Sequence, residues 1–169
     1  GLGDVYKRQG IEWLGAPDPA ADAECIIMLM EFYKRLGFDL SKLRLLINSM
    51  GDAQCRPAYR EQVKQFILDH ADEMCDECRE HYDAVKVLLD GAGVVYEEDY
   101  KLVRGLDYYT RTVFEVQVDN GMGAQNAIGG GGRYDKLAEE VGGRPTPGLG
   151  FALGFERCVL ALEAAGVEF

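Results

Sequence analysis

The sequence predicts an α+β domain with a mainly antiparallel sheet flanked by helices. Helical and strand patterns alternate in the first half of the chain, whereas the later strands follow one another through short turns. Length and composition agree with this fold class, because 169 residues with 47% hydrophobic and 28% charged content fit one ordinary globular domain. No apolar run in the sequence approaches the roughly 18 residues that cross a bilayer, so we expect no membrane association.

Charge and cysteine content argue against two classes of protein, general nucleic-acid binders and disulfide-rich proteins. With 18 Lys+Arg against 29 Asp+Glu, the net charge of −11 argues against a general nucleic-acid binder, which normally has a basic face. Contact with nucleic acid through another part of a longer protein stays open. The five cysteines are odd in number and irregularly spaced, which argues against a disulfide framework and favours a reducing cytoplasm. The N-terminus lacks a basic-then-apolar signal peptide.

The first half of the chain carries a clear helix signal. Asp18 is a good N-cap with Pro19 at the first helical position, and Ile26, Met30 and Tyr33 recur at helical spacing. Residues 1–9 show no clear period, and could be a lead-in or a short strand. The expected elements of this half are strands at 10–15, 43–48 and 94–96, and helices at 20–36, 57–69 and 82–90.

The second half alternates like a half-buried sheet. In the strand expected at 112–118, Phe114, Val116 and Val118 fall on one face, and Val113, Glu115 and Gln117 on the other. A returning strand is expected to start at 126–128 and run into four glycines. The remaining expected elements are a helix at 134–141, a strand at 147–154 and a closing helix at 155–165.

The segment Leu102–Glu115, LVRGLDYYTRTVFE, is the strongest candidate site. It combines Arg104 and Asp107 with the adjacent Tyr108 and Tyr109, just before an apolar strand. A buried arginine needs an anion, and buried tyrosine hydroxyls need polar partners. The residues indicate a small-molecule pocket or, equally, a surface arginine with two half-buried tyrosines.

Two glycine-rich segments are further candidates. Ile128–Asp135, IGGGGRYD, lets the backbone approach a ligand closely, or forms a flexible hairpin loop; it matches neither a P-loop nor a dinucleotide fingerprint. In Pro145–Arg157, PTPGLGFALGFER, glycines 148, 150 and 154 thin one face of a strand. That face suits a flat ligand such as a nucleotide base, or close packing of a helix. Arg157 near a helix start suggests an anionic ligand, because cations prefer the other helix end.

A zinc-like pattern, HxxxxCxxCxxH, is formed by His70, Cys75, Cys78 and His81. The ligand types suit zinc, but all four positions fall within one polar, helical stretch without a second cysteine pair. We therefore expect solvated side chains and no metal at these four positions. The other cysteines, at 25, 55 and 158, lie in or near helical patterns and are expected to be packing residues.

Together these motifs resemble the catalytic core of the histidyl-tRNA synthetase family, which is a class II aminoacyl-tRNA synthetase family. RGLDYYTRTVFE resembles the family's histidine-binding motif, GGGRYD its companion, and GLGFALGFER the third class-defining motif. GIEWLG followed by DAE resembles the strand just past the second class motif. The similarity covers most of residues 10–162.

The resemblance implies a two-step reaction. Histidine and ATP form histidyl-adenylate and pyrophosphate, and the histidyl group then passes to tRNA(His). Mg²⁺ is implied as part of the charge that ATP chemistry needs. A soluble, cytoplasmic homodimer is implied for the full-length protein.

The resemblance also implies residue roles. Arg104 would be catalytic, contacting the α-phosphate and the histidine carboxylate, and Glu12 would hold the α-ammonium group. The remaining expected histidine-binding residues are Tyr108, Tyr109, Gly130, Gly131 and Tyr134, with the stretch 130–134 expected to be a closing loop. The expected ATP-binding residues are Gly154 and Arg157.

Departures from the family pattern predict a fragment. The first two class motifs and the anticodon-binding domain would lie outside this chain, so we expect the chain alone to be nearly inactive. Arg8 stands where a substrate-binding glutamine is expected. The expected organisation is a lead segment at 1–9 that need not be native, core parts at 10–49 and 94–169, and a shortened helical insertion at 50–93.

Two alternatives belong to other function classes. One is a synthetase-like regulatory subunit of ATP phosphoribosyltransferase in histidine biosynthesis, which keeps the fold but senses histidine. Arg104 and the TRTVFE continuation favour the synthetase over this subunit. The other is a small zinc-binding interaction module, which would require about one equivalent of metal in the purified protein.

Overall fold

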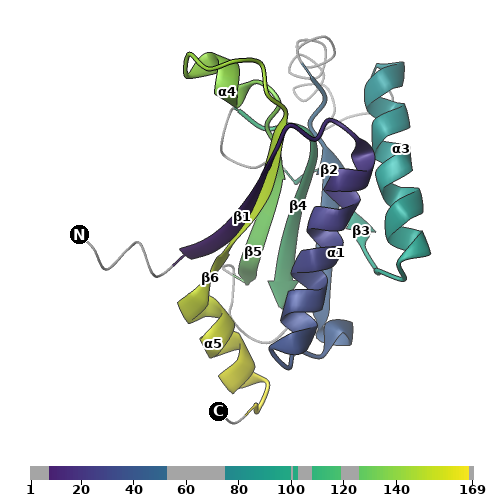
Figure 1. The fold of residues 1–169 in the computed structure, drawn as a ribbon. Helices are drawn as coiled ribbons and strands as arrows, with labels where there is room; N and C mark the ends of the chain where they lie inside the picture. Colours follow the sequence, from purple (N-terminus) through teal and green to yellow (C-terminus); the bar gives the residue numbers. More distant parts are fainter. Residues whose placement is uncertain (1–7, 53–74, 100, 103–107, 119–125, 168–169) are drawn as a thin grey trace.

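The computed structural model describes residues 8–52, 75–99, 101–102, 108–118 and 126–167. These residues form a six-stranded sheet with helices packed against one of its faces (Figure 1). The strands are β1 Arg8–Leu14, β2 Leu43–Ser49, β3 Glu97–Glu98, β4 Thr110–Val118, β5 Ala127–Arg133 and β6 Gly148–Gly154. The helices are α1 Pro19–Arg35, α3 Asp76–Gly91, α4 Leu137–Glu140 and α5 Phe155–Ala164, with a short 3-10 turn, η2, at Leu40–Lys42.

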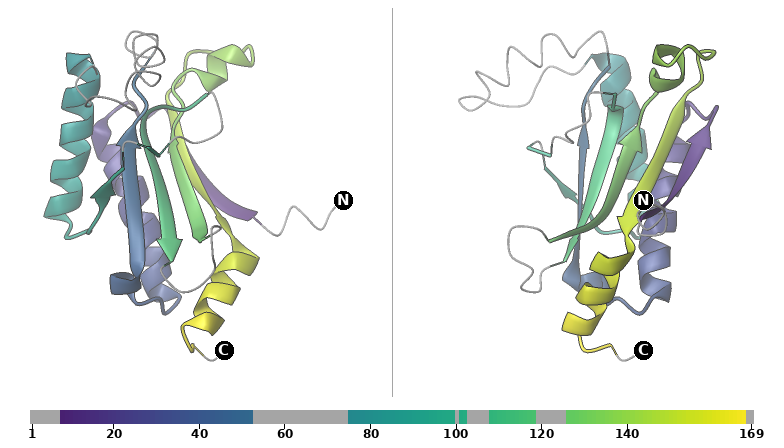
Figure 2. Two further views of the ribbon diagram at one scale, coloured as in Figure 1. Left: turned by 180° about the vertical axis from the view of Figure 1, so that it is seen from behind. Right: turned by 90° about the vertical axis from the view of Figure 1, so that its left-hand side faces the viewer.

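The sheet is mainly antiparallel, which confirms the predicted fold class. Its strand order is β1-β6-β5-β4-β2-β3, and β2–β3 is the parallel pair among the described strands. Helices α1 and α3 lie on one face, whereas the view from behind in Figure 2 shows the other face without a helix over it. We name these the helical face and the open face. In the described part of the chain, no helix is long and apolar enough to cross a membrane.

Helix α1 begins as its sequence predicts. The Asp18 carboxylate accepts a hydrogen bond from the backbone N–H of Ala20 at 2.8 Å, and Pro19 is the first helical residue. The inner stripe is confirmed, because Ile26 and Tyr33 are fully buried in the core with Met30 beside them. Burying these side chains against the sheet supplies most of what holds the helix in place.

Strand β4 separates the two faces of the sheet as its alternation predicts. Phe114, Val116 and Val118 lie in the core beneath α1, whereas Val113 belongs to a second apolar cluster on the open face. The core side chains of the neighbouring strands share the helical face of the sheet. They include Leu45, Ile47, Ile128, Leu149 and Phe151.

The prediction of a closing loop at 130–134 is wrong, because residues 130–133 belong to strand β5. Residues 129–132 belong to β5 and are paired with β4 on one side and β6 on the other. Glycine is a poor strand former alone, but two complete ladders override that preference. The close packing around this strand also requires glycine. A Cβ at Gly129 would collide with the Tyr33 hydroxyl, and one at Gly131 would lie 2.7 Å from Phe151 Cα. A rigid strand therefore takes the place of the expected closing loop.

Other boundaries differ from the prediction. Helix α3 begins at Asp76, before the expected start, and strand β3 lies just after the expected 94–96. The helix expected at 134–141 is shortened to α4, and β1 begins within the expected lead segment, at Arg8. The helix expected at 57–69 lies outside the described residues.

A buried ion pair joins α1 to the end of β5. Asp22 is 1% exposed and Arg133 is fully buried; Arg133 Nε donates to Asp22 Oδ1 at 2.8 Å. The same carboxylate accepts from Thr112 Oγ1 at 2.8 Å and is hydrogen-bonded to His81 Nε2. Burial alone would raise the pKa of Asp22, but the hydrogen bonds from His81 and Arg133 and the charge of Arg133 outweigh it and lower that pKa.

Arg133 also donates hydrogen bonds to backbone carbonyl groups in the segment that enters α1. Its Nη1 donates to the Ala16 carbonyl at 2.8 Å, and its Nη2 donates to the Asp18 carbonyl at 3.2 Å. One guanidinium thus orients the end of β5, the connection after β1 and the side chain of Asp22.

Replacing Asp22 by alanine is expected to destabilise the protein by about 3–5 kcal/mol, because the Arg133 charge would stay buried without its partner. The native Asp22 pKa is lowered, so its stabilising contribution is present above about pH 4 and is lost as the pH falls through the folded-state pKa. Urea unfolding across this pH range should show the variant and the parent converging in acid. Asp83→Ala, at an exposed ion pair on α3, is the control and should change stability by less than about 1 kcal/mol.

Candidate active site

Four residues predicted from the sequence meet on the open face of the sheet. Glu12 comes from β1, Tyr108 and Tyr109 lie just before β4, and Tyr134 directly follows β5. The Tyr134 hydroxyl donates a hydrogen bond to Glu12 Oε2. The Tyr108 ring lies edge-on to Tyr134, with centroids 6.1 Å apart, and 5.0 Å from the Tyr109 ring. Three segments distant in sequence therefore build one aromatic cluster that ends in a carboxyl group.

Glycines on the neighbouring strands make room for these side chains. A Cβ at Gly132 would lie 2.9 Å from Tyr109 Cδ1, one at Gly148 would collide with the Tyr134 ring, and one at Gly150 would collide with Glu12. The register pairs Gly150 with Glu12 and with Gly132, so all of these positions share the open face. The predicted thinning of one face of β6 is thus present, and the tyrosines and Glu12 occupy the space.

Glu12 has an altered acidity. Although its side chain keeps contact with solvent, partial burial against the sheet raises the pKa of its carboxyl above the usual glutamate value. Tyr109 is buried and Tyr108 half-buried, so the cluster offers apolar ring surface beside a carboxyl group. This combination suits a ligand with a cationic amine and a polar ring.

A hollow of about 370 Å³ lies further along the same face. Arg157, from the first turn of α5, reaches over it and donates from Nη1 to the Ala127 carbonyl at 2.7 Å. Gly130, Ala152 and Gly154 form its small-residue floor, and Glu115 lies at its edge. A flat group can lie on such a floor with its anionic part toward the guanidinium.

Gly130 and Gly131, both predicted to bind histidine, lie on opposite faces of the sheet. Gly130 pairs with Glu115 and Ala152 on the open face, whereas Gly131 pairs with Phe114 and Phe151, whose side chains lie in the core. Gly130 therefore lines the hollow beside Arg157, and Gly131 permits close packing on the helical face.

Several sequence predictions fall outside the described residues or are separated by the fold. Arg104, expected to be catalytic, and His70 lie outside the described residues. Cys75 and Cys78 lie together at the start of α3, but the His81 ring turns instead to the buried Asp22. The HxxxxCxxCxxH pattern therefore does not come together as one ligand set.

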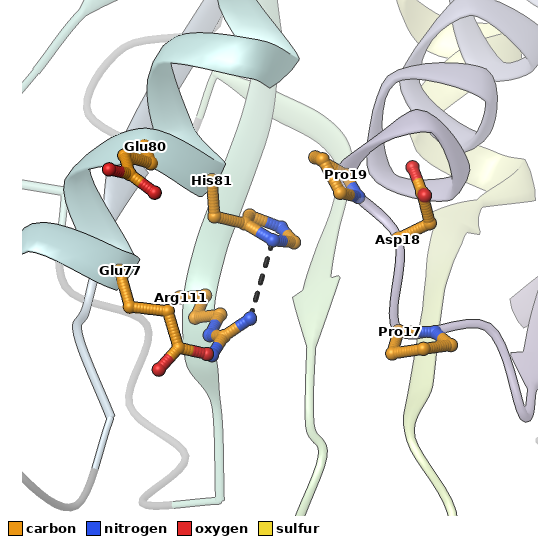
Figure 3. A pocket seen from close by; sticks show the side chains of 7 residues that line it. All are labelled: Pro17, Asp18, Pro19, Glu77, Glu80, His81 and Arg111. Atoms are coloured by element: carbon orange, nitrogen blue, oxygen red, sulfur yellow. Dashed lines mark hydrogen bonds and ion pairs between the residues drawn. The ribbon is translucent and has the colours of Figure 1, made fainter.

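A polar pocket between the start of α1 and α3 had no counterpart in the sequence predictions (Figure 3). Arg111 Nη1 donates to His81 Nδ1 at 3.4 Å, and its Nη2 is paired with Glu77. Arg111 has a positive φ of 53° at a register shift in β4, which the sequence TRT does not reveal. Its guanidinium is already committed to Glu77, so we do not assign this pocket a ligand.

Known proteins align with most of this sequence and share its architecture. The family model for histidyl-tRNA synthetase matches residues 59–158. The histidine–tRNA ligases of Streptomyces coelicolor and Thermotoga maritima are 43% and 42% identical over 198 residues, in alignments that cover 96% of this chain and 46% of each relative. The chain thus spans about half the length of these relatives.

Solved structures agree. The apo histidyl-tRNA synthetase of S. aureus superposes with a TM-score of 0.83 at 39% identity, over 96% of this chain and 48% of that one. A Bacillus halodurans protein described as an ATP phosphoribosyltransferase regulatory subunit/histidyl-tRNA synthetase has a TM-score of 0.70 at 20% identity, over 93% of this chain and 52% of that one, which shows the fold alone.

The fold defines the chain first as a class II aminoacyl-tRNA synthetase core: a mainly antiparallel sheet with helices on one face and an aromatic cluster on the other. More narrowly, the chain belongs to the histidyl-tRNA synthetase family, since the family model matches more than half of it.

Gly148→Ala is expected to displace the Tyr134 ring and break its hydrogen bond to Glu12, because the atoms that would crowd the new methyl group all belong to side chains. The fold should survive while the near-ultraviolet circular dichroism of the tyrosine cluster changes. Tyr134→Phe, which removes only the hydroxyl, should leave the ring in place. Gly91→Ala, where nothing lies within 4 Å, should leave the spectrum unchanged. An unchanged spectrum in Gly148→Ala would contradict this packing.

Proposed function

We propose that this chain is part of the catalytic core of a histidine–tRNA ligase. That enzyme activates histidine with ATP and transfers it to tRNA(His). The observation that carries the proposal is the cluster of Glu12, Tyr108, Tyr109 and Tyr134 on the open face of a sheet with this family's fold. Because the chain spans about half the length of its relatives, the activity is proposed for the complete protein that contains it.

The aromatic cluster suits the substrate histidine. The Glu12 carboxylate would pair with the α-ammonium group, while Tyr108 and Tyr109 would line the imidazole. Tyr134 holds Glu12 in position through its hydroxyl. A pocket that hydrogen-bonds an imidazole rejects amino acids without one, because its own polar groups would be left unpaired.

The chemistry is a displacement at phosphorus. A histidine carboxylate oxygen attacks the α-phosphorus of ATP, the bond to the bridging oxygen breaks, and pyrophosphate leaves with its electron pair. Such a reaction depends on positioning and on cations more than on an acid–base pair. Arg104 is the residue proposed to stabilise the charge at the α-phosphate, and that role stays a prediction.

The hollow beside Arg157 is proposed to take the nucleotide. The adenine ring or ribose would lie on the floor that includes Gly130 and Gly154, with Arg157 beside the phosphates. Glu115 at the edge of the hollow is the carboxylate that would hold Mg²⁺, which is usually bound by one or two carboxylates and substrate phosphates. The ion would neutralise part of the phosphate charge.

Further assignments extend to the complete protein. With a net charge of −11, this chain offers little general attraction for nucleic acid, so we propose that other parts of the full-length protein provide most contacts with tRNA(His). A homodimer and a cytoplasmic location are proposed on the same family basis.

The alternative is a regulatory subunit that keeps the fold and senses histidine. Its support is the fold-level likeness to the Bacillus halodurans protein. Much higher identity to histidine–tRNA ligases favours the enzyme. Histidine-dependent ATP–pyrophosphate exchange by the complete protein separates the two, since a sensor would bind histidine without exchange.

Glu12→Gln is expected to raise the KM for histidine in the exchange assay about 10- to 100-fold, because a charge-assisted contact to the α-ammonium group is lost. In the parent protein, histidine affinity should fall as the pH drops through the pKa of Glu12, which is raised above the usual value of about 4.3. The Glu12→Gln variant should not show this loss of histidine affinity at low pH. Glu24→Gln, exposed on α1, is the control; equal KM values in both variants would contradict the assignment.

Arg157→Ala is expected to raise the KM for ATP about tenfold or more with little effect on the KM for histidine, because a phosphate loses a cationic partner. Arg35→Ala, which removes an exposed arginine paired with Glu31 on α1, should leave both values unchanged. If Arg157→Ala changed only the KM for histidine, the proposal that the nucleotide binds in this hollow would be contradicted.

A further inference from the structure

Three potential metal ligands converge where β2 ends and α3 begins. A carboxylate oxygen of Asp52 and the sulfur atoms of Cys75 and Cys78 all lie within 4.8 Å of one another. Asp52 follows Gly51, which turns the chain after β2 with a positive φ of 65°. Cys75 is the N-cap of α3, and Cys78 lies in its first turn.

We propose that Asp52, Cys75 and Cys78 form a binding site for a zinc ion. Tetrahedral zinc with sulfur ligands at about 2.3 Å and an oxygen ligand at about 2.0–2.2 Å places neighbouring ligand atoms roughly 3.5–3.8 Å apart. The observed cluster reaches this spacing by closing about 1 Å, within the range of side-chain rotation. Three protein ligands leave the fourth position for water.

The ligand types select the metal. Two cysteine sulfurs with spacing C-x-x-C disfavour magnesium and calcium, which prefer oxygen ligands, and favour zinc. Cys78 is fully buried and Cys75 half-buried, so a bound ion would be largely shielded from solvent. The two other described cysteines, Cys25 and Cys158, lie apart in the apolar core, where burial raises the pKa of the thiols to about 12 and about 11.

The surrounding charges fit a divalent cation. Two thiolates and one carboxylate carry −3, and zinc reduces this to −1. The Arg111 guanidinium, which is paired with Glu77, also lies 4.0 Å from Asp52 Oδ2. The first turn of α3 also favours negative charge, because the helix dipole is positive at that end.

This site differs from the pattern visible in the sequence. His81 is removed from the ligand set, since its ring contacts Asp22 and Arg111. Asp52 enters the set although it lies far from the cysteines in sequence. A zinc ion here would fasten the end of β2 to the start of α3, and binding it would stabilise the folded chain.

The test is the metal content of the purified complete protein, measured by mass spectrometry after exposure to zinc and gel filtration. About one equivalent of zinc is expected, and cobalt substitution should give the visible absorption of a tetrahedral site with thiolate ligands. Removing zinc with a chelator should lower the Tm. Zinc well below one equivalent, or a cobalt spectrum without thiolate bands, would overturn the proposal.

Variants locate the ion. Cys78→Ser and the more conservative Asp52→Asn should each reduce bound zinc and abolish the effect of the chelator on the Tm. Asp52 is only half-buried, so its variant should fold even if the cysteine variant does not. Cys158→Ala, a core cysteine outside the cluster, should retain one equivalent. Full zinc binding by Asp52→Asn, or a Cys75–Cys78 disulfide in the zinc-treated protein, would contradict the assigned ligand set.

Discussion

The ion pair between Asp22 and Arg133 is the constraint on which the remaining structure depends. Both side chains are almost completely removed from solvent, so neither charge is tolerable without the other. Arg133 ends β5, and the next residue is Tyr134 of the aromatic cluster. The pair therefore fixes the direction in which the chain leaves the sheet, and with it the position of the tyrosine that holds Glu12. A buried charge on the helical face thereby orders a pocket on the open face.

The sheet divides stability and chemistry between its two faces. The larger apolar core fills the helical face beneath α1, whereas the open face carries a smaller apolar cluster together with Glu12 and the tyrosines. The aromatic cluster and the hollow beneath Arg157 both lie on that face. This placement suits the proposed reaction, in which an amino acid and a nucleotide must meet.

Much of this architecture could be predicted from the sequence because it is written in local patterns. The cap at Asp18, the alternation in β4 and the thinned face of β6 each depend on a few neighbouring residues. The start of the glycine strand could be predicted but its continuation to Arg133 could not, since pairing with β4 and β6 overrides a local preference for a loop. The buried role of Arg133 and the approach of Asp52 to the two cysteines depend on contacts between distant segments, which no spacing in the sequence reveals.

The unusual backbone at Arg111 decides where one positive charge lies. At the register shift in β4, the side chains of two consecutive residues, Arg111 and Thr112, both reach the helical side, to Glu77 and to Asp22. Regular alternation would instead direct Arg111 toward the tyrosines. A guanidinium there would repel an incoming ammonium group. The local backbone distortion therefore keeps this cation on the opposite side of the sheet from the aromatic cluster that is proposed to take an ammonium group.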